Sequence, residues 1–288
     1  MSNPVTNALT FDVEDWHQLV EWKLNGTLPA CSPRVLAQTH EILNMLASRS
    51  VRATFFILGL VAEAYPGVVR DIAAAGHEVG SHGWSHRLVY HQSPEEFRVE
   101  THRSKSALED ILGRPVLGYR AAEFSVTSAS RWALDILAEL GFKYDSSIFP
   151  VDGRRYGIPD APVMPHTVRT MAGDLLELPL TVVTWRGRRY PVGGGGYFRL
   201  APYAVTRAAI RRINSEGRPA VLYFHPYEFS RSLLVPRLTS ARAWIAGGRY
   251  LVFHNVNRGA NRRRLARLLN ECRFAPAAEI LHLGQYTR

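Results

Sequence analysis

Residues 7–12 read NALTFD, a short apolar run that ends in an acidic side chain. Similar runs occur at 53–58 (ATFFIL) and 220–224 (AVLYF), with shorter candidates at 78–81, 117–120 and 143–146. Segments with helical spacing lie between them, at 33–48, 66–75, 94–112, 129–140, 202–216 and 261–270. Alternating strands and helices predict a parallel sheet with helical crossovers, either an open doubly wound sheet or a (β/α) barrel.

Polar side chains at the ends of these strands favour the barrel. Asp12, His82, Arg120, Asp145 and His225 each stand at or directly after the end of an apolar run. In a parallel barrel these positions meet at the carboxyl-terminal mouth, where active sites are built. We therefore expect an α/β fold with one domain over residues 1–288. Pro, Gly and Arg interrupt the pattern around residues 150–200, which predicts an elaborated loop or hairpin there.

The composition is that of a globular chain with a full core. Of 288 residues, 46% are hydrophobic and 21% charged, which excludes a disordered chain. The start has no basic, apolar leader, and no stretch is apolar for the roughly 18 residues that a membrane span needs. Cys31 and Cys272 match no zinc or disulfide pattern. The expected location is the cytoplasm or the inner face of the membrane.

Charge is distributed unevenly along the chain. Residues 1–144 hold 13 Lys and Arg against 16 Asp and Glu, a net charge of −3, whereas residues 145–288 hold 22 against 9, a net charge of +13. Arg supplies 32 of the 35 basic residues, which is consistent with compositional drift. The alternative is attraction to an anionic partner, such as a membrane surface or an acidic glycan. No nucleic-acid motif accompanies the charge, so no nucleic-acid partner is predicted.

Two histidines and a group of acids are the strongest chemical signal. His82 and His86 are four residues apart, so on a helical turn they would share one face and could bind one metal ion. Asp12, Glu14 and Asp15 place three acids within four residues, and their mutual repulsion requires a positive neighbour. The alternative for the histidines is that they are ordinary polar residues of the surface, and the alternative for the three acids is that they form a solvated turn.

Together these residues can form a hydrolytic centre. Two histidines and one carboxylate hold an ion that polarises a carbonyl and activates water, and a second carboxylate can act as general base. His225 is then placed as a general acid, although a packed core histidine is an equal alternative. Arg120 either orients a carboxylate or makes an ordinary ion pair.

Five motifs in this order resemble one known family. They are TFDVED (10–15), HGWSH (82–86), GYRAAEFS (118–125), YDSSIFP (144–150) and VLYFHP (221–226). The set resembles the polysaccharide deacetylases of the NodB-homology type, carbohydrate esterase family 4, over roughly residues 7–284. TFDVEDW, GGGGYFR (193–199) and YFHPYEF (223–229) look like the branch associated with bacterial exopolysaccharide loci. The resemblance implies a distorted (β/α) barrel of about seven strands and metal-dependent removal of N-acetyl groups from an amino-sugar glycan.

The resemblance also assigns roles to individual residues. Asp12 matches the catalytic base, Arg120 the arginine that orients it, and His225 the catalytic acid. His82 and His86 match the histidine ligands of a divalent ion, expected to be zinc. Asp145 lies near a motif that shapes the site.

One departure leaves the third metal ligand open. The family has adjacent aspartates in its first motif, whereas Val13 and Glu14 separate Asp12 from Asp15 here. The resemblance favours Asp15, and Glu14 is the alternative.

Two other functions compete with the deacetylase. One is a metal-independent, allantoinase-like amidohydrolase acting on a small cyclic amide, and the other is a non-catalytic glycan-binding relative. The glycines at 193–196 predict either a glycan contact or a mobile loop. Trp16, Trp84 and Trp185 can stack on sugar rings or serve in packing. The partner expected from the resemblance is an N-acetylated glycan, with possible peripheral contact to a membrane or a lipid-linked precursor.

Overall fold

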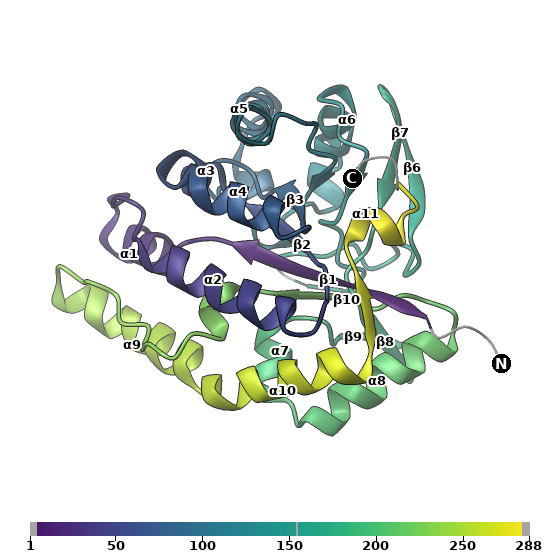
Figure 1. Cartoon of the computed structure of the whole chain (residues 1–288). Coiled ribbons are helices and arrows are strands. Elements are labelled where there is room, and N and C mark those ends of the chain that lie inside the picture. Colours follow the sequence, from purple (N-terminus) through teal and green to yellow (C-terminus); the bar gives the residue numbers. More distant parts are fainter. Residues whose placement is uncertain (1–4, 154, 284–288) are drawn as a thin grey trace.

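The computed structural model describes residues 5–153 and 155–283, and strands alternate with helices as predicted (Figure 1). The strands are β1 (Thr6–Val13), β2 (Thr54–Ile57), β3 (Glu78–Ser81), β4 (Gly118–Tyr119), β5 (Tyr144–Asp145), β6 (His166–Thr170), β7 (Gly173–Glu177), β8 (Val182–Trp185), β9 (Arg188–Pro191), β10 (Val221–Phe224) and β11 (Arg273–Ala275). The helices are α1 (Trp16–Asn25), α2 (Arg34–Ala47), α3 (Gly59–Ala64), α4 (Pro66–Ala74), α5 (Pro94–Leu112), α6 (Trp132–Glu139), α7 (Gly195–Leu200), α8 (Tyr203–Ser215), α9 (Ala241–Asn255), α10 (Arg258–Glu271) and α11 (Ala277–Ile280). The six predicted strands correspond to β1–β5 and β10.

The strands form one sheet that is almost entirely parallel. Seven of them follow each other in the order β10, β1, β2, β3, β4, β5 and β7, all parallel to their neighbours. β6 is antiparallel to β7, and β11 pairs with the start of β1. Within the described residues the order ends at β10 and β6, so hydrogen bonds do not close the sheet into a full barrel. The predicted α/β fold with about seven parallel strands is confirmed, as a distorted and open barrel.

The apolar runs form central strands because both faces of the sheet are covered. Every residue of β2 is buried. Phe55 stacks on Phe11 with ring centroids 5.1 Å apart and belongs to the main core, whereas its neighbour Phe56 joins a second core cluster with Tyr144. Successive side chains of a strand point to opposite faces, so a strand buried on both sides is apolar at consecutive positions.

Local signals set the ends of the predicted helix over 94–112. The Ser93 hydroxyl accepts a hydrogen bond from the Glu96 backbone amide (3.2 Å), and the Glu96 carboxylate accepts one from the Ser93 amide (2.8 Å). The two reciprocal hydrogen bonds form a capping box. α5 ends at Gly113, whose φ of 65° suits glycine.

The segment over 150–200 holds two hairpins, β6–β7 and β8–β9, as the interrupted pattern indicated. It is more than an addition to the surface, because β7 pairs with β5 and continues the parallel sheet. Strands from both halves of the chain therefore build one sheet. The two cysteines are unpaired. None of the helices within 5–153 and 155–283 has the length and apolar character needed to cross a bilayer.

Candidate active site and metal-binding cluster

The polar residues at the carboxyl ends of the strands meet in one cleft. Asp12 and Glu14 at the end of β1, His82 after β3 and His225 after β10 all line a cleft of about 1030 Å³. The expected convergence at this edge of the sheet is confirmed for these residues. Arg120 lies directly beneath the cleft and is completely buried.

Arg120 holds Asp12 in place. One terminal nitrogen of the guanidinium donates hydrogen bonds to Oδ1 of Asp12 (3.0 Å) and to the Thr10 hydroxyl (2.6 Å). Its Nε donates to the Ser146 carbonyl (3.1 Å), and its other terminal nitrogen donates to the Ser146 hydroxyl (2.9 Å). The guanidinium also lies over the Phe56 ring, 4.3 Å from its centroid. Because every nitrogen has a partner, Arg120 fixes both the position and the orientation of the Asp12 carboxylate.

Glu14, His82 and His86 form a compact group of potential metal ligands, each offering an atom within 4.8 Å of the others. Oε2 of Glu14 lies 2.9 Å from Nε2 of His86 and 3.9 Å from Nε2 of His82. Although buried, this oxygen accepts no hydrogen bond of good geometry. Burial alone would raise the pKa of Glu14, but the imidazoles of His86 and His225 outweigh it and hold the pKa well below its usual range.

The protonation of His82 suits a metal ligand. Its Nδ1 donates to the Arg120 carbonyl at 2.8 Å, so the proton occupies Nδ1 and the lone pair of Nε2 faces Glu14. Burial lowers the pKa of His82 to about 4, which keeps the imidazole neutral at neutral pH. The buried Oε2 of Glu14 lacks a hydrogen-bond partner and lies beside the Nε2 atoms of His82 and His86. The hydrogen bond of Nδ1 fixes the orientation of the His82 ring. This set of donor atoms fits a divalent ion.

Asp15 does not join this group. Its Oδ1 accepts a hydrogen bond from the His17 amide (3.0 Å), and its Oδ2 accepts one from the Ser32 amide (2.5 Å). Asp15 is thus the N-cap of α1 and ties that helix to the start of α2. The preference for Asp15 as third ligand does not fit this geometry, which brings Glu14 to the histidines instead.

The two histidines are not on a helical turn. Residues 82–88 form an irregular loop after β3, in which Gly83 and His86 have φ values of 75° and 63°. This left-handed backbone folds the loop back, so that the two imidazole rings lie 5.5 Å apart. The two histidines therefore lie close enough to share one ion, as the spacing suggested, but a loop and not a helical turn brings them together.

His225 faces the cluster from the other side of the cleft. Its Nε2 lies 3.5 Å from Oε1 of Glu14, and its Nδ1 lies 3.4 Å from Oε1 of Glu228. Its ring stacks on Tyr227 with centroids 4.9 Å apart. Burial would lower the pKa of His225, but the carboxylates of Glu14 and Glu228 outweigh it and raise the pKa to about 9. At neutral pH His225 therefore carries a proton.

Glu228 and Arg199 support His225, and neither was predicted from the sequence as a site residue. Arg199 on α7 donates to Oε1 of Glu228 (3.3 Å) and to the Phe253 carbonyl (3.1 Å), and both Arg199 and Glu228 are buried. Glu228 follows His225 by three residues within a short 3₁₀ turn, Pro226–Glu228. The spacing of Glu228, three residues after the candidate acid His225, was the feature of the sequence that could have indicated its role.

Asp145 lies below the site and does not line the cleft. Its Oδ1 accepts a hydrogen bond from the Ser147 hydroxyl (2.5 Å), and the Ser147 hydroxyl in turn accepts one from the Ala121 amide (2.8 Å). Asp145 is also the strand partner of Glu177, whose carboxyl is buried beside it. Asp145 thus supports the segment that follows Arg120 and is not among the described residues that line the cleft.

The glycine run packs closely against the sheet. A Cβ on Gly194 would lie 2.2 Å from the Tyr223 ring, and one on Gly195 would lie 2.0 Å from Oε2 of Glu228. Gly195 begins α7, so the run is not a structureless loop, and only Gly196 of the four lines the cleft. Of the three tryptophans, Trp16 lines the cleft, Trp84 packs under Arg103, and Trp185 is exposed on the β8–β9 hairpin.

The parallel sheet and the polar cluster at its carboxyl edge place this protein among α/β proteins that build their active sites at strand ends. Residues 6–144 match the family model for polysaccharide deacetylases, and residues 146–282 match a domain of unknown function, DUF3473. The match over residues 6–144 confirms the resemblance to the polysaccharide deacetylases that the motifs indicated.

Curated relatives and solved structures agree with this family. The chain is 36% identical over 75 residues to a peptidoglycan-N-acetylglucosamine deacetylase of Bacillus cereus, which covers 26% of this chain and 27% of the relative. It is 34% identical over 109 residues to a chitin deacetylase of Pestalotiopsis sp, which covers 37% and 36%. The matches thus span about a quarter to a third of these relatives. A crystal structure assigned to the polysaccharide deacetylases, from Mycobacterium smegmatis, has the same fold, with a TM-score of 0.66 and 22% identity over 99% of this chain and 92% of that one.

Proposed function

We propose that this protein is a metal-dependent N-deacetylase that removes acetyl groups from amino sugars of a bacterial polysaccharide or its precursor. The observation that carries the proposal is that three groups meet in one cleft. They are Asp12, which Arg120 fixes, the cluster of Glu14 with two histidines, and His225 on the opposite side. Hydrolysis of an acetamide needs a base for the attacking water and an acid for the departing nitrogen, and the cleft offers both.

Glu14, His82 and His86 would hold the ion, and their mixed imidazole and carboxylate donors favour zinc. When bound, a divalent ion would polarise the acetamide carbonyl and make a water molecule more acidic. Asp12, oriented by Arg120, would accept the proton that the attacking water gives up. The buried hydrogen bonds of Arg120 keep this carboxylate from turning away.

His225 is suited to the opposite task. With its pKa raised to about 9, the imidazole carries a proton at neutral pH that it can donate to the amine nitrogen as the C–N bond breaks. An amide nitrogen leaves poorly until it is protonated, so this donation is required. Glu14 and Glu228 keep the imidazolium in place on both sides.

The cleft has the size and lining expected for a carbohydrate. Its volume of about 1030 Å³ is bounded by aromatic side chains that can pack on sugar rings: Trp16, Trp22, Phe124, Tyr156, Tyr223, Tyr227, Tyr250 and Phe253. An N-acetylated amino-sugar glycan is the substrate class that we propose. Three further points stay predictions. They are a role in exopolysaccharide biosynthesis, the cytoplasmic location, and peripheral contact with a membrane or lipid-linked precursor. We also infer that the chain forms one domain, because β7, β10 and β11 complete the sheet begun by β1–β5.

Acetate release from N-acetylglucosamine oligomers tests the proposal. The purified protein with added zinc should release acetate, and Asp12→Asn and His225→Ala should each lower turnover by roughly 10² or more while keeping the metal. Hydrolysis of a cyclic amide without any metal would instead support the allantoinase-like alternative. Binding of the oligomers without acetate release would support the glycan-binding alternative.

A further inference from the structure

Helix α9 exposes an apolar surface that the core does not explain. Only Ala243 and Gly247 of its fifteen residues are buried. The helix lies beside α1, and Gly247 packs close to Leu238 and to Leu24 of α1 (Figure 1). Ile245 is 85% exposed and Val252 64% exposed, and both lie on the outer side of the helix. Trp244 and Phe253 are each about half exposed. Large side chains on one exposed helix normally mark an interaction surface.

The same part of the chain is strongly basic. Residues 229–270 contain nine arginines and no aspartate or glutamate, a net charge of +9. Among the described residues, only Arg262 and Arg267 of these nine make ion pairs, with Glu41 and Glu271. Arg242 and Arg249 are exposed on α9 itself. Most of the basic excess of the C-terminal half is therefore concentrated around α9 and α10 without neutralising partners.

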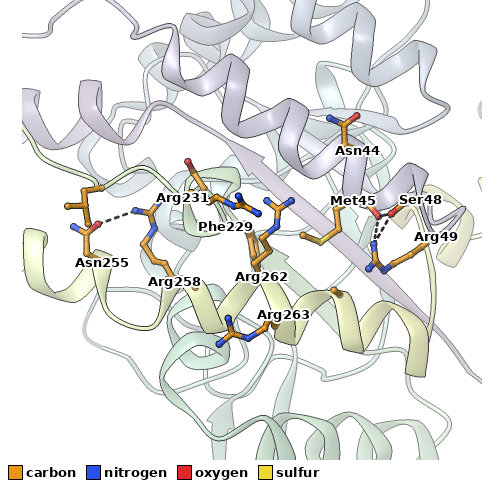
Figure 2. A pocket seen from close by; sticks show the side chains of 14 residues that line it. Asn44, Met45, Ser48, Arg49, Phe229, Arg231, Asn255, Arg258, Arg262 and Arg263 are labelled. Carbon is orange, nitrogen blue, oxygen red and sulfur yellow. Dashed lines mark hydrogen bonds between the residues drawn. The ribbon is translucent and has the colours of Figure 1, made fainter.

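A groove beside α9 collects several of these arginines. It lies between α2 and α10, has a volume of about 680 Å³, and is lined by Arg49, Arg231, Arg258, Arg262 and Arg263. Figure 2 shows Arg258, Arg262 and Arg263 on α10, Arg49 just after the end of α2, and Arg231 on the loop that precedes α9. No acidic side chain is among its described lining residues.

The groove and α9 are adjacent. Asn255, the last residue of α9, lines the groove and exchanges hydrogen bonds with the backbone of Leu234, each 2.9 Å long. Leu233, which also lines the groove, is 71% exposed, so this face carries an exposed aliphatic side chain as well as arginines.

We propose that the outer side of α9 and the adjoining arginine groove form a docking face for an anionic phospholipid bilayer. Aliphatic and aromatic side chains on an exposed helix, surrounded by arginine, suit insertion at the level of the lipid head groups. Each arginine near an anionic leaflet adds about 1 kcal/mol of attraction. Arg231 and Arg263 of the groove are exposed and make no ion pair among the described residues, so their guanidinium groups are available to the phosphates of the head groups.

Two other occupants fit less well. A second copy of the chain would bring another acid-free surface of the same charge into contact, and the two would repel. A soluble acidic polysaccharide would satisfy the arginines but would leave Ile245, Val252 and Leu233 in water. An anionic bilayer satisfies both the charge and the apolar side chains.

Docking would also bear on the substrate, and this step rests on the proposed function. Arg249, Tyr250, Phe253 and His254 of α9 line the catalytic cleft. A bilayer bound to the outer side of the same helix would lie next to the cleft. The substrate would then be an amino-sugar glycan held at the membrane surface, such as one carried on a lipid.

Sedimentation with vesicles tests the docking face on the full chain. The protein should pellet with vesicles of phosphatidylcholine mixed with phosphatidylglycerol, should not pellet with phosphatidylcholine alone, and should be released by high salt. Ile245→Asp combined with Val252→Asp should weaken binding at least about tenfold, because each side chain loses its apolar burial. Arg231→Gln combined with Arg263→Gln should weaken it roughly ten- to thirty-fold.

Matched controls lie on other faces of the protein. Val99→Asp changes a valine that is 58% exposed on α5, and Arg169→Gln changes an exposed arginine on β6, and both should bind like the unchanged protein. Melting temperatures of all variants should agree, since each side chain is exposed. Equal binding to neutral vesicles, or unchanged binding of the α9 and groove variants, would overturn the proposal.

Two readouts separate this inference from the proposed function. Acetate release from soluble oligomers should be unchanged in Ile245→Asp with Val252→Asp, because neither residue lines the cleft. Vesicle binding without any deacetylase activity would refute the catalytic proposal and leave the docking face standing. Binding to a soluble anionic polysaccharide but not to anionic vesicles would assign the face to a glycan and refute the bilayer.

Discussion

Nδ1 of His225 lies 3.4 Å from Oε1 of Glu228, and Arg199 donates to that same oxygen at 3.3 Å. Glu228 is buried and its Oε2 has no hydrogen-bond partner, so its charge acts mainly on these two neighbours. This places Glu228 as a positioning residue that keeps the proposed acid protonated.

Replacement of Glu228 by glutamine should move the pH profile of activity. Glu228 helps to raise the pKa of His225, so its neutral replacement should lower that pKa, and the basic limb of kcat/KM should shift to lower pH. Turnover at neutral pH should fall roughly tenfold. Glu123→Gln is the control, because Glu123 also lines the cleft but pairs with Lys23 and Arg155. An unmoved basic limb in Glu228→Gln would show that Glu228 only supports the fold.

Glu14 and Asp15 are expected to respond differently to substitution. Glu14→Gln and His82→Ala should each lose bound zinc and activity, because each removes a member of the cluster. Asp15→Ala should keep its zinc and lower the free energy of unfolding by about 0.5–2 kcal/mol, the usual effect of a lost N-cap. Elemental analysis after dialysis and thermal melting check the two effects. Zinc lost from Asp15→Ala but kept by Glu14→Gln would reverse the assignment.

Glu14 and Asp15 show which parts of the fold and the site could be predicted from the sequence and which could not. The apolar runs predicted β1–β5 and β10 because buried parallel strands need apolar side chains on both faces. The motifs also named Asp12, His82, His86 and His225, which lie around one cleft at the end of the sheet, but they favoured Asp15 over Glu14 as the third ligand. Asp15 precedes a helix, and aspartate is a preferred N-cap, so a local signal for its structural role was present. The resemblance to adjacent aspartates outweighed that signal.

Other features could not be predicted because long-range packing decides them. The left-handed backbone at His86 brings the two histidines together without a helix, and nothing in HGWSH indicates it. The place of Asp145 below the cleft depends on its partner Glu177, which is 32 residues away and was expected in a surface hairpin. The exposure of α9 depends equally on what the rest of the fold leaves uncovered.

The buried pair of Asp145 and Glu177 should make stability depend on pH. Burial, and then the charge of Asp145, raise the pKa of Glu177 well above its ordinary value of 4.5. Above that pH the unfolded chain releases this proton while the native state keeps it, so the free energy of unfolding should fall as pH rises toward the native pKa. The glutamine of Glu177→Gln cannot ionise, so in this variant the free energy of unfolding should no longer fall for this reason as pH rises.

Denaturant unfolding of both proteins from pH 5 to pH 8 measures this effect. The variant should gain stability relative to the unchanged protein as pH rises, and zinc content should not change. Glu216→Gln serves as the control, because Glu216 is an exposed carboxylate paired with Arg218, and it should show no such gain. A constant difference between Glu177→Gln and the unchanged protein would mean that the proton is not retained on folding.

The last prediction concerns two neighbouring glycines of α7. A Cβ on Gly195 would lie within 2.2 Å of both carboxylate oxygens of Glu228, whereas one on Gly196 would meet nothing closer than the Phe253 ring at 3.6 Å. Neither glycine has a positive φ, and both lie in a helix, where alanine is intrinsically favoured. Gly195→Ala must therefore displace the Glu228 carboxylate from His225 and Arg199. Turnover should fall roughly 10- to 100-fold, as for a misplaced catalytic group, and the basic limb should move to lower pH as in Glu228→Gln. Gly196→Ala should keep the basic limb where it is. Combining Gly195→Ala with Glu228→Gln should add little to either change alone, because both act on the same contact. A full additive loss in the double variant would show that Gly195 matters for a reason other than Glu228.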